Sequence, residues 1–253
     1  MPPVDRVFIV NLVRRRDRAF QLRPMLKTAG FKAPVEWFRA VDGLELNDSI
    51  LSVYGVKLYT DWKNADARTV FHNRDLTVGE LGCALSHWIL WRRIDDDAYQ
   101  TTLILEDDAA LPPGIGPLID DHLLELDRLM PDWDLCYVGR KRVLTPPYCK
   151  DPPEPEVHLS ERFVIPAHSW CTHAYVVSQK GARRLLEQRL DQFLIPVDEM
   201  LPALYSWHPR PDVRAYFGDG DRLKVAAIDP NLSDQFDDIS DTERSAELQW
   251  SGG

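Results

Sequence analysis

The chain has 253 residues, of which 44% are hydrophobic and 28% are charged, and its formal net charge is −10. This length can bury a substantial core, and the composition is that of a soluble globular protein. The excess of acidic residues argues against a nucleic-acid polymer as partner, because phosphate backbones are bound by basic surfaces. A small nucleotide is still compatible, since a divalent cation can bridge carboxylates and a diphosphate.

The N-terminal residues show no secretion signal, because the apolar run at residues 7–10 is too short. No apolar stretch reaches the roughly eighteen residues of a membrane span. We therefore expect a cytoplasmic protein without a membrane span, or a lumenal one if the sequence is an excised domain of a longer secreted protein. The spacing of the four cysteines favours free thiols over a disulfide between Cys149 and Cys171.

The first half of the sequence predicts two strands and a helix before residue 55. Residues 7–12 form an apolar, β-branched run that is typical of a buried strand, and residues 35–40 predict a second strand. A basic stretch and a helix lie between them, and the helix is expected to end at Gly30, because glycine commonly follows the last helical residue. Residues 55–75 show no period and are expected to form a long surface loop.

The helix expected from Thr77 to about Ile94 has the clearest start signal. Thr77 and Glu80 form a capping-box pattern, in which each side chain binds the backbone N–H of the other residue. Small residues recur on one face at spacings of three and four, which allows a ligand or a backbone to approach closely. These residues are Gly79, Gly82, Cys83 and Ser86.

The second half continues the alternation of strands and helices, which predicts a single α/β domain around a mostly parallel sheet. Prolines indicate an irregular flap at residues 145–155, and the acidic segment at 229–253 is expected to be a tail or a lid. Ser178 is the expected N-cap of one helix. The predicted strands are 101–105, 135–138 and 174–177, and the predicted helices are 115–129, 181–188 and one from Pro196 onward.

The strongest candidate for chemistry is the run Glu106-Asp107-Asp108, which ends a predicted apolar strand. Two carboxylates about 5 Å apart repel each other by roughly 3 kcal/mol at an effective dielectric constant of about 20. Strand alternation predicts that Glu106 and Asp108 face one side and Asp107 the other. A divalent cation that carries a diphosphate would relieve the repulsion. A solvated acidic turn or a helix N-cap is the alternative interpretation.

An ordered set of motifs over nearly the whole chain resembles glycosyltransferase family 25. Residues 137–142, 196–202 and 240–243 resemble its collagen-modifying branch, the procollagen galactosyltransferases, more than its bacterial lipopolysaccharide branch. The motifs that carry the resemblance lie at residues 8–18, 40–43, 76–87, 105–108, 132–140, 174–178, 196–199 and 240–243.

The resemblance implies a GT-A-like nucleotide-diphospho-sugar transferase fold, with residues 1–228 as the catalytic domain. It implies a UDP-galactose donor, a divalent metal such as Mn²⁺ and inversion at the anomeric carbon. The implied acceptor is a hydroxyl group, either hydroxylysine of a collagen-like protein or, alternatively, a lipopolysaccharide or another glycan.

The resemblance also assigns roles to individual residues by their position. Asp108 is the leading metal ligand, and Glu106 faces the ribose or the metal. Arg14 and Arg18 of the first motif are expected to bind the diphosphate, because a guanidinium can bind phosphate through two hydrogen bonds. Glu80 and His87 are expected either at the donor or directly behind the residues that bind it. The alternatives are a turn former for Asp42 and a structural histidine for His87. Residues expected at the nucleotide are Asn11, Arg14, Arg18, Asp42, Glu80, His87, Glu106 and Asp107.

Inverting transfer needs a general base that removes the proton of the acceptor hydroxyl. Asp198 and Glu199 are the candidates, because they are acidic, lie at a predicted helix start and match the motif at 196–199. A favourable interaction with the helix dipole is the alternative explanation for both.

Two further features bear on the acceptor and the metal. His168, Trp170 and His173 are expected near the acceptor, with ordinary packing as the alternative for the tryptophan. The sequence departs from the collagen branch between residues 229 and 240, where an expected histidine is missing. Asp234 and Gln235 are local substitutes for it.

Two other classes of protein fit parts of the pattern. A non-catalytic glycosyltransferase-like module would keep the fold, but the intact acids at 106–108 and 198–199 argue against a loss of turnover. A phosphoacceptor receiver domain also gathers acids at strand ends, but it is much shorter and places its acids on different strands.

Overall fold

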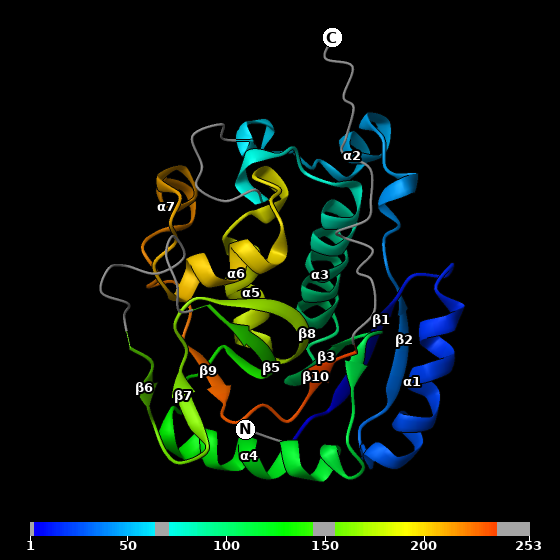
Figure 1. Ribbon diagram of the computed structural model, residues 1–253, viewed down its shortest axis with the longest axis vertical. Coiled ribbons are helices and arrows are strands. Elements are labelled where there is room, and N and C mark those ends of the chain that lie inside the picture. The colour runs from blue at the N-terminus through cyan, green and yellow to red at the C-terminus, as the bar shows by residue number, and fades with distance from the viewer. Residues whose placement is uncertain (1–2, 64–70, 144–154, 237–253) are drawn as a thin grey trace.

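The computed structural model describes residues 3–63, 71–143 and 155–236, and within these ranges strands and helices alternate (Figure 1). Eight of the described strands form one sheet in the order β2-β1-β3-β8-β5-β9-β7-β6. The strands are β1 (Arg6–Asn11), β2 (Val35–Arg39), β3 (Thr101–Glu106), β5 (Leu135–Arg142), β6 (Val157–His158), β7 (Phe163–Ile165), β8 (Ser169–Ser178) and β9 (Val225–Ile228), and a separate pair is β4 (Ala109–Ala110) with β10 (Asp234–Gln235). The α-helices are α1 (Arg16–Ala29), α2 (Asp48–Tyr54), α3 (Val78–Asp96), α4 (Ile115–Leu129), α5 (Gln179–Glu187), α6 (Val197–Tyr205) and α7 (Pro211–Phe217).

Most strands of the sheet run in one direction. β1 pairs in parallel with β2 and with β3, and β5 pairs in parallel with β9. β8 is antiparallel to both of its neighbours, and β7 is antiparallel to both of its own. The predicted α/β fold with a mostly parallel sheet is therefore confirmed, with β7 and β8 as the reversed strands.

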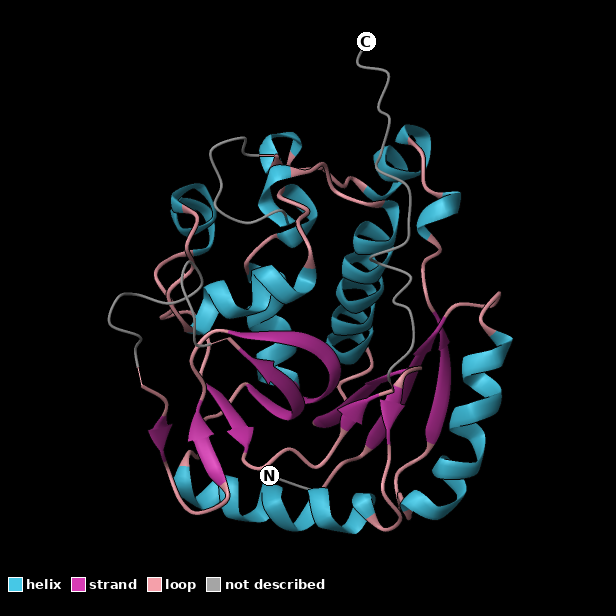
Figure 2. Cartoon of the chain, viewed as in Figure 1, coloured by secondary structure: helices cyan, strands magenta, loops and turns pink. Residues whose placement is uncertain are grey.

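The sheet separates two hydrophobic cores, because successive side chains of a strand face opposite sides. Phe8 and Ile104 belong to the core beneath α3, α5 and α6, whereas Ile9 and Leu105 belong to the core beneath α1 and α4. Figure 2 shows helices on both sides of the strands. Both faces of the sheet are covered, which explains why the central strands β1 and β3 are mostly apolar and buried.

The helix boundaries follow the predicted capping signals. Thr77 and Glu80 make both hydrogen bonds of the capping box at the start of α3. Gly30 ends α1 with φ of 73°, a left-handed conformation that glycine adopts without steric cost. The Ser178 hydroxyl accepts the N–H of Gly181 at the start of α5.

The structure corrects the expectation of a surface loop at residues 55–75. Two short 3-10 helices, η2 (Thr60–Trp62) and η3 (Phe71–Asn73), lie in this segment. Trp62 is 1% exposed and His72 is 3% exposed, so the segment contributes to the interior. The proline-rich flap expected at 145–155 falls almost entirely outside the described residues.

The chain after β9 returns to the carboxyl end of β3. Residues 234–235 form β10, which pairs with β4 directly after the acidic run, and the N–H of Phe236 donates to the carbonyl of Asp108. We call residues 233–236 the strap. The remaining residues of the expected tail or lid, 237–253, lie outside the described ranges.

Within the described ranges, the helices are all too short or too polar to cross a lipid bilayer.

Candidate active site

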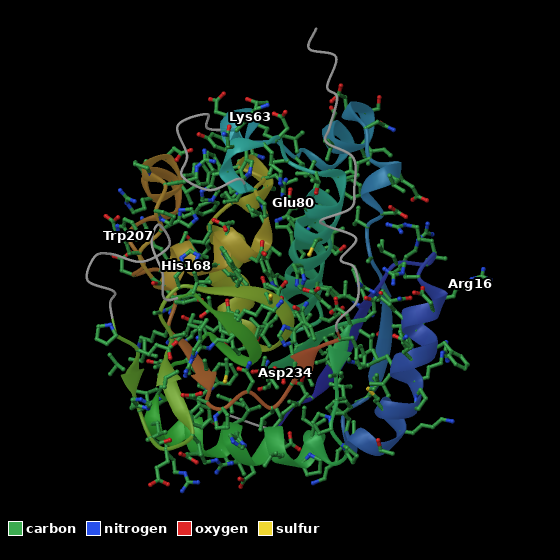
Figure 3. All side chains as sticks on the ribbon, in the orientation of Figure 1. Arg16, Lys63, Glu80, His168, Trp207 and Asp234 are labelled. Atoms are coloured by element: carbon green, nitrogen blue, oxygen red, sulfur yellow. The ribbon has the colours of Figure 1, made fainter. Side chains whose placement is uncertain are left out.

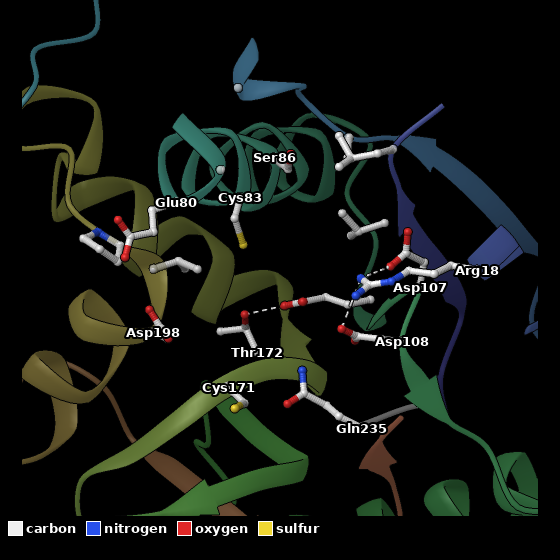
Figure 4. Close-up of a pocket in the computed structure, with 18 of the residues that line it drawn as sticks. Arg18, Glu80, Cys83, Ser86, Asp107, Asp108, Cys171, Thr172, Asp198 and Gln235 are labelled. Atoms are coloured by element: carbon white, nitrogen blue, oxygen red, sulfur yellow. Dashed lines mark hydrogen bonds and ion pairs between the residues drawn. The ribbon is translucent and has the colours of Figure 1, made fainter. Parts of the chain in front are cut away.

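A cavity of about 660 Å³ opens beside the carboxyl ends of β1 and β3. The start of α3, the N-terminus of α6, part of β8 and the strap complete its walls (Figure 4). Its volume is typical of small-molecule sites, and its place at strand ends is where α/β sheets usually bind ligands. The acids on its walls are Glu80, Glu106, Asp107, Asp108, Asp198 and Asp234, and the cationic side chains are Arg14, Arg18, Arg74 and Lys141.

Glu106 ends β3 and is held on two sides. The Thr172 hydroxyl donates to Glu106 Oε1 at 2.5 Å, and His87 Nε2 lies 3.4 Å from the same oxygen. Burial alone would raise the pKa of Glu106, but the nearby His87 and the hydrogen bond from Thr172 outweigh it and hold that pKa below its usual value. Glu106 is therefore a fixed carboxylate in the cavity wall.

Asp107 and Asp108 both contact the guanidinium of Arg18. Arg18 Nη1 lies 2.9 Å from Asp107 Oδ1 and 3.3 Å from Asp108 Oδ2, and Figure 4 shows the three side chains together. This arrangement contradicts the predicted alternation, because β3 ends at Glu106 and the two aspartates lie in the turn before β4. Arg18, expected at a diphosphate, thus serves as counter-charge to two acids in this structure.

Asp108 combines burial with an unpartnered oxygen. Its Oδ1 is buried and has no hydrogen-bond partner among the described residues. Burial first, and the charge of Glu106 next, raise its pKa to about 7. Hard oxygen ligands are what Mn²⁺ and Mg²⁺ prefer, and a cation beside this carboxylate would favour its charged form. The donor set of Glu106 and Asp108 fits a divalent cation.

His87 lies behind Glu106 rather than in the cavity. It is fully buried, and its Nδ1 lies 2.8 Å from the Tyr175 hydroxyl, which accepts a hydrogen bond from Trp91 Nε1. The hydroxyl can then donate its own proton to His87 Nδ1, which leaves the other ring proton on Nε2, facing Glu106. His87 therefore lies in the position behind the donor site that was one of its two expected roles, where it contacts Glu106.

The other residues of the first motifs divide between the cavity and its surroundings. Arg14 lines the cavity and lies 2.8 Å from Asp42, whose second oxygen accepts the N–H of Leu44. Asn11 donates to Asp107 at 2.7 Å. Asp42 and Asn11 are not among the cavity-lining residues, and the Asp42 side chain caps the short 3-10 helix η1 (Gly43–Glu45). Arg16 projects into solvent from α1, as Figure 3 shows.

The first turns of α3 form one wall of the cavity. Glu80 accepts hydrogen bonds from Arg74 at 2.6 and 2.9 Å in addition to its capping-box bond. Gly79, Cys83 and Ser86 line the cavity, as their small side chains predict. A Cβ on Gly82 would lie 2.6 Å from the Val41 carbonyl oxygen, so this glycine admits a backbone instead.

The two acids of α6 face different surroundings, which separates the candidate bases. Asp198 is half-buried and lines the cavity, and burial, with the charges of Glu199 and Glu80 next, raises its pKa to about 8. Glu199 is 1% exposed and binds His72, His208 and Trp170 instead. The structure therefore excludes Glu199 from the cavity wall and keeps Asp198.

The sequence pointed to the right part of β8 but to the wrong side chains. Cys171 and Thr172 line the cavity, whereas His168, Trp170 and His173 do not. His173 Nε2 lies 3.2 Å from the Ser233 carbonyl, and His168 Nδ1 lies 3.4 Å from the Trp207 carbonyl (Figure 3). Lys141 and Arg74 also line the cavity; Lys141 lies in the motif at 137–142 but was given no role from the sequence, and Arg74 lies in no motif.

The strap brings the two local substitutes for the missing histidine to the cavity. Asp234 and Gln235 both line it. Figure 4 shows Gln235 below Asp108 and opposite the start of α3. The motif departure between 229 and 240 therefore did locate a wall of the site.

These features define an α/β protein with an acid-lined cavity at the carboxyl ends of two strands. The chain belongs to glycosyltransferase family 25, because the profile described as "Glycosyltransferase family 25 (LPS biosynthesis protein)" matches residues 4–201. The family resemblance stated from the motifs is confirmed.

Curated relatives point to the same family. Procollagen galactosyltransferase 1 of Danio rerio is 34% identical over 249 residues, which is 96% of this chain and 39% of that protein. A glycosyltransferase 25 family member of Drosophila pseudoobscura pseudoobscura is 33% identical (97% and 38%), and procollagen galactosyltransferase 2 of Homo sapiens is 31% identical (95% and 37%). The chain spans less than two-fifths of the length of these relatives.

Among solved structures, the apo form of mouse xyloside xylosyltransferase 1 is similar over 86% of this chain and 65% of that one. Its sequence identity is 15% and its TM-score is 0.34, values too low to support an argument about this chain.

Proposed function

We propose that this chain transfers galactose from UDP-galactose to a hydroxyl acceptor with the help of a divalent cation such as Mn²⁺, and with inversion at the anomeric carbon. The observation that carries the proposal is the carboxylate pair Glu106 and Asp108 in the wall of a nucleotide-sized cavity, with a buried Asp108 oxygen that lacks a partner among the described residues. Family membership and the printed names of the relatives support the sugar and the reaction type.

Each wall of the cavity has a distinct task in this proposal. Glu106 and Asp108 would hold the cation, which supplies positive charge to the departing diphosphate when bound. Arg14 and Lys141 stand on the cavity wall where they can bind anionic oxygens. Asp198 would accept the proton of the attacking hydroxyl, and its raised pKa makes it a stronger base than an exposed carboxylate.

The proposed acceptor is hydroxylysine of a collagen-like protein. Two of the relatives named above are called procollagen galactosyltransferases, which favours this acceptor. A lipopolysaccharide or other glycan is the second candidate, because the family description names lipopolysaccharide biosynthesis. Presenting the chain with a hydroxylysine-containing collagen peptide and with a bacterial oligosaccharide, each with UDP-galactose, distinguishes the two.

The proposal is tested by measuring UDP released from UDP-galactose with and without Mn²⁺. Slow metal-dependent release is expected from the chain, and Asp108→Ala should abolish it. Asp96→Ala is the matched control, because Asp96 is an exposed acid at the far end of α3, about 24 Å from Glu80 at the helical rise. Equal release by wild type and Asp108→Ala would count against the assignment.

A further inference from the structure

Glu199 is the centre of a buried polar cluster beside the cavity. His208 Nε2 lies 2.7 Å and His72 Nε2 lies 3.1 Å from Glu199 Oε2, and Trp170 Nε1 donates to Oε1 at 3.1 Å. His72 comes from η3, Trp170 from β8 and His208 from the turn after α6. We call these four residues the Glu199 cluster. It joins three segments that are far apart in the sequence.

The geometry of His208 decides what kind of cluster this is. The backbone N–H of Arg210 donates to His208 Nδ1 at 3.2 Å, so Nδ1 offers its lone pair and Nε2 carries the proton. That proton points to Glu199. A histidine that binds a metal through Nε2 would need its lone pair there and a proton on Nδ1, facing another N–H. The His72–Glu199–His208 group is therefore a hydrogen-bonded carboxylate rather than a metal site.

The cluster fixes the first turn of the helix that carries Asp198. Successive residues of an α-helix point about 100° apart, because a turn takes about 3.6 residues. Glu199, the third residue of α6, points into the interior. Asp198, the second residue, then points to a different side of the helix, where it lines the cavity. A rotation or shift of this turn would move both side chains together.

Stability alone does not account for such a cluster. A buried charge with its hydrogen-bond partners is often no more stable than well-packed apolar side chains of the same volume. What a carboxylate with three converging donors supplies beyond burial is a single orientation. Turnover is sensitive to such orientation, since a misplacement of about 1 Å can cost about 100-fold in rate.

We propose that the Glu199 cluster positions Asp198 for proton abstraction, with Glu199, His208, His72 and Trp170 acting as positioning residues that do not touch the substrates. The inference rests on the proposed function, because it takes Asp198 as the general base. In the proposed function the donor is bound through Glu106 and Asp108, through Arg14 and through Lys141, none of which belongs to α6. Disturbing the cluster should therefore lower kcat while leaving the donor KM nearly unchanged.

The test compares His208→Leu with His208→Gln. The glutamine amide can place an N–H where Nε2 stands, whereas leucine leaves Glu199 without that donor. We expect kcat to fall about 10- to 100-fold in His208→Leu with a donor KM within about 2-fold, and His208→Gln to recover most of the loss. His122→Gln is the matched control, because His122 is a buried, hydrogen-bonded histidine on α4, and it should leave kcat unchanged.

Two further measurements keep the inference testable whatever the variants do. If His208→Leu does not fold, Trp170→Phe removes one donor to Glu199 and should give a smaller loss of kcat at unchanged donor KM. Amide hydrogen exchange of residues 197–201 should be faster in His208→Leu, or in Trp170→Phe, than in wild type, and slower again in His208→Gln.

Three results would overturn the inference: a folded His208→Leu with wild-type kcat, unchanged exchange at 197–201, or stoichiometric metal in the purified chain that is lost in His208→Gln. If the wild-type chain transfers no galactose, the proposed function fails, and the exchange measurement still decides whether the cluster fixes the turn that carries Asp198.

Discussion

Asp198 is the residue whose surroundings match a chemical task most closely. Its carboxylate lines the cavity and shares it with Glu80 and Glu106. Burial first, then the charges of Glu199, Glu80 and Glu106, raise its pKa to about 8. A carboxyl group with a pKa near the working pH is well suited to take a proton and pass it on.

Asp198→Asn should lower the rate of galactose transfer by about 100- to 10,000-fold, the usual contribution of a general base. The asparagine keeps the shape of the side chain but cannot accept the proton. Donor binding, measured as the UDP-galactose KM, should stay nearly unchanged. The variant should also be at least as stable as wild type at pH 8, because it removes a half-buried carboxylate that must otherwise ionise. A variant with transfer within about 3-fold of wild type would exclude Asp198 as the base.

The same assignment fixes the pH dependence of the wild-type chain. A base acts when deprotonated, so kcat/KM should rise with pH through a midpoint at about 8. Stability should change in the opposite sense: the folded chain holds this proton up to about pH 8, whereas the unfolded chain releases it near the ordinary aspartate pKa of 3.8. The free energy of unfolding should therefore fall between these limits as pH rises. This part of the pH dependence should be absent in Asp198→Asn. A flat rate profile from pH 6 to 9 would contradict the assignment.

At the scale of elements, α3 is placed by a close backbone approach. Gly82 faces the turn at residues 41–43, where an added Cβ would lie 2.6 Å from the Val41 carbonyl oxygen and 2.8 Å from the Gly43 nitrogen. Ser86, one turn later, accepts the N–H of Val41 through its hydroxyl. The helix that carries Glu80 into the cavity wall is thereby docked directly on the backbone.

Gly82→Ala should destabilise the chain by about 1 to 3 kcal/mol, because backbone atoms cannot give way to the new methyl group. Helix propensity alone predicts the opposite sign, a gain of about 1 kcal/mol. Urea unfolding measures the difference. Gly114→Ala serves as comparison, because a Cβ there meets nothing within 4 Å and only its positive φ of 76° is strained. A stabilised Gly82→Ala would show that the helix is not docked in this way.

The elements that the sequence predicted are those whose ends depend on local interactions. The capping box at Thr77, Gly30 after α1 and Ser178 before α5 each act within a few residues, so their patterns are visible in the chain itself. The burial of Trp62 and His72 could not be predicted, because it depends on contacts such as that between His72 and Glu199, which are 127 residues apart.

The sequence predicted the cavity residues that belong to a single motif. It did not predict the contacts that residues of different elements make with one another. The acids at 106–108 and Asp198 lie in the cavity as expected. Thr172, which donates a hydrogen bond to Glu106, was missed. It lies beside Glu106 because β8 pairs antiparallel with β3 and β5, and this pairing is not visible in the sequence. The sequence could not show that Asp198 faces the cavity while Glu199 faces the interior. That orientation of α6 is seen only from the partners of Glu199, which come from distant parts of the chain.

At the scale of the whole molecule, the sheet order gathers distant segments at one edge. β3 lies between β1 and β8, so the acids that follow β3 meet α1 on one side and Thr172 on the other. The strap then crosses from β9 to β4 and adds Asp234 and Gln235. One cavity therefore collects residues from the first, middle and last parts of the described chain.

The central claim is that this cavity binds a nucleoside diphosphate sugar through a divalent cation. Thermal unfolding with UDP-sugars, with and without Mn²⁺, tests it most directly, because a ligand that binds only the folded state raises Tm. We predict that UDP-galactose raises the Tm of wild type and of Asp96→Ala only when Mn²⁺ is present, and raises that of Asp108→Ala in neither condition. An equal, metal-independent rise in all three proteins, or no rise in wild type at saturating UDP-galactose and Mn²⁺, would contradict the account.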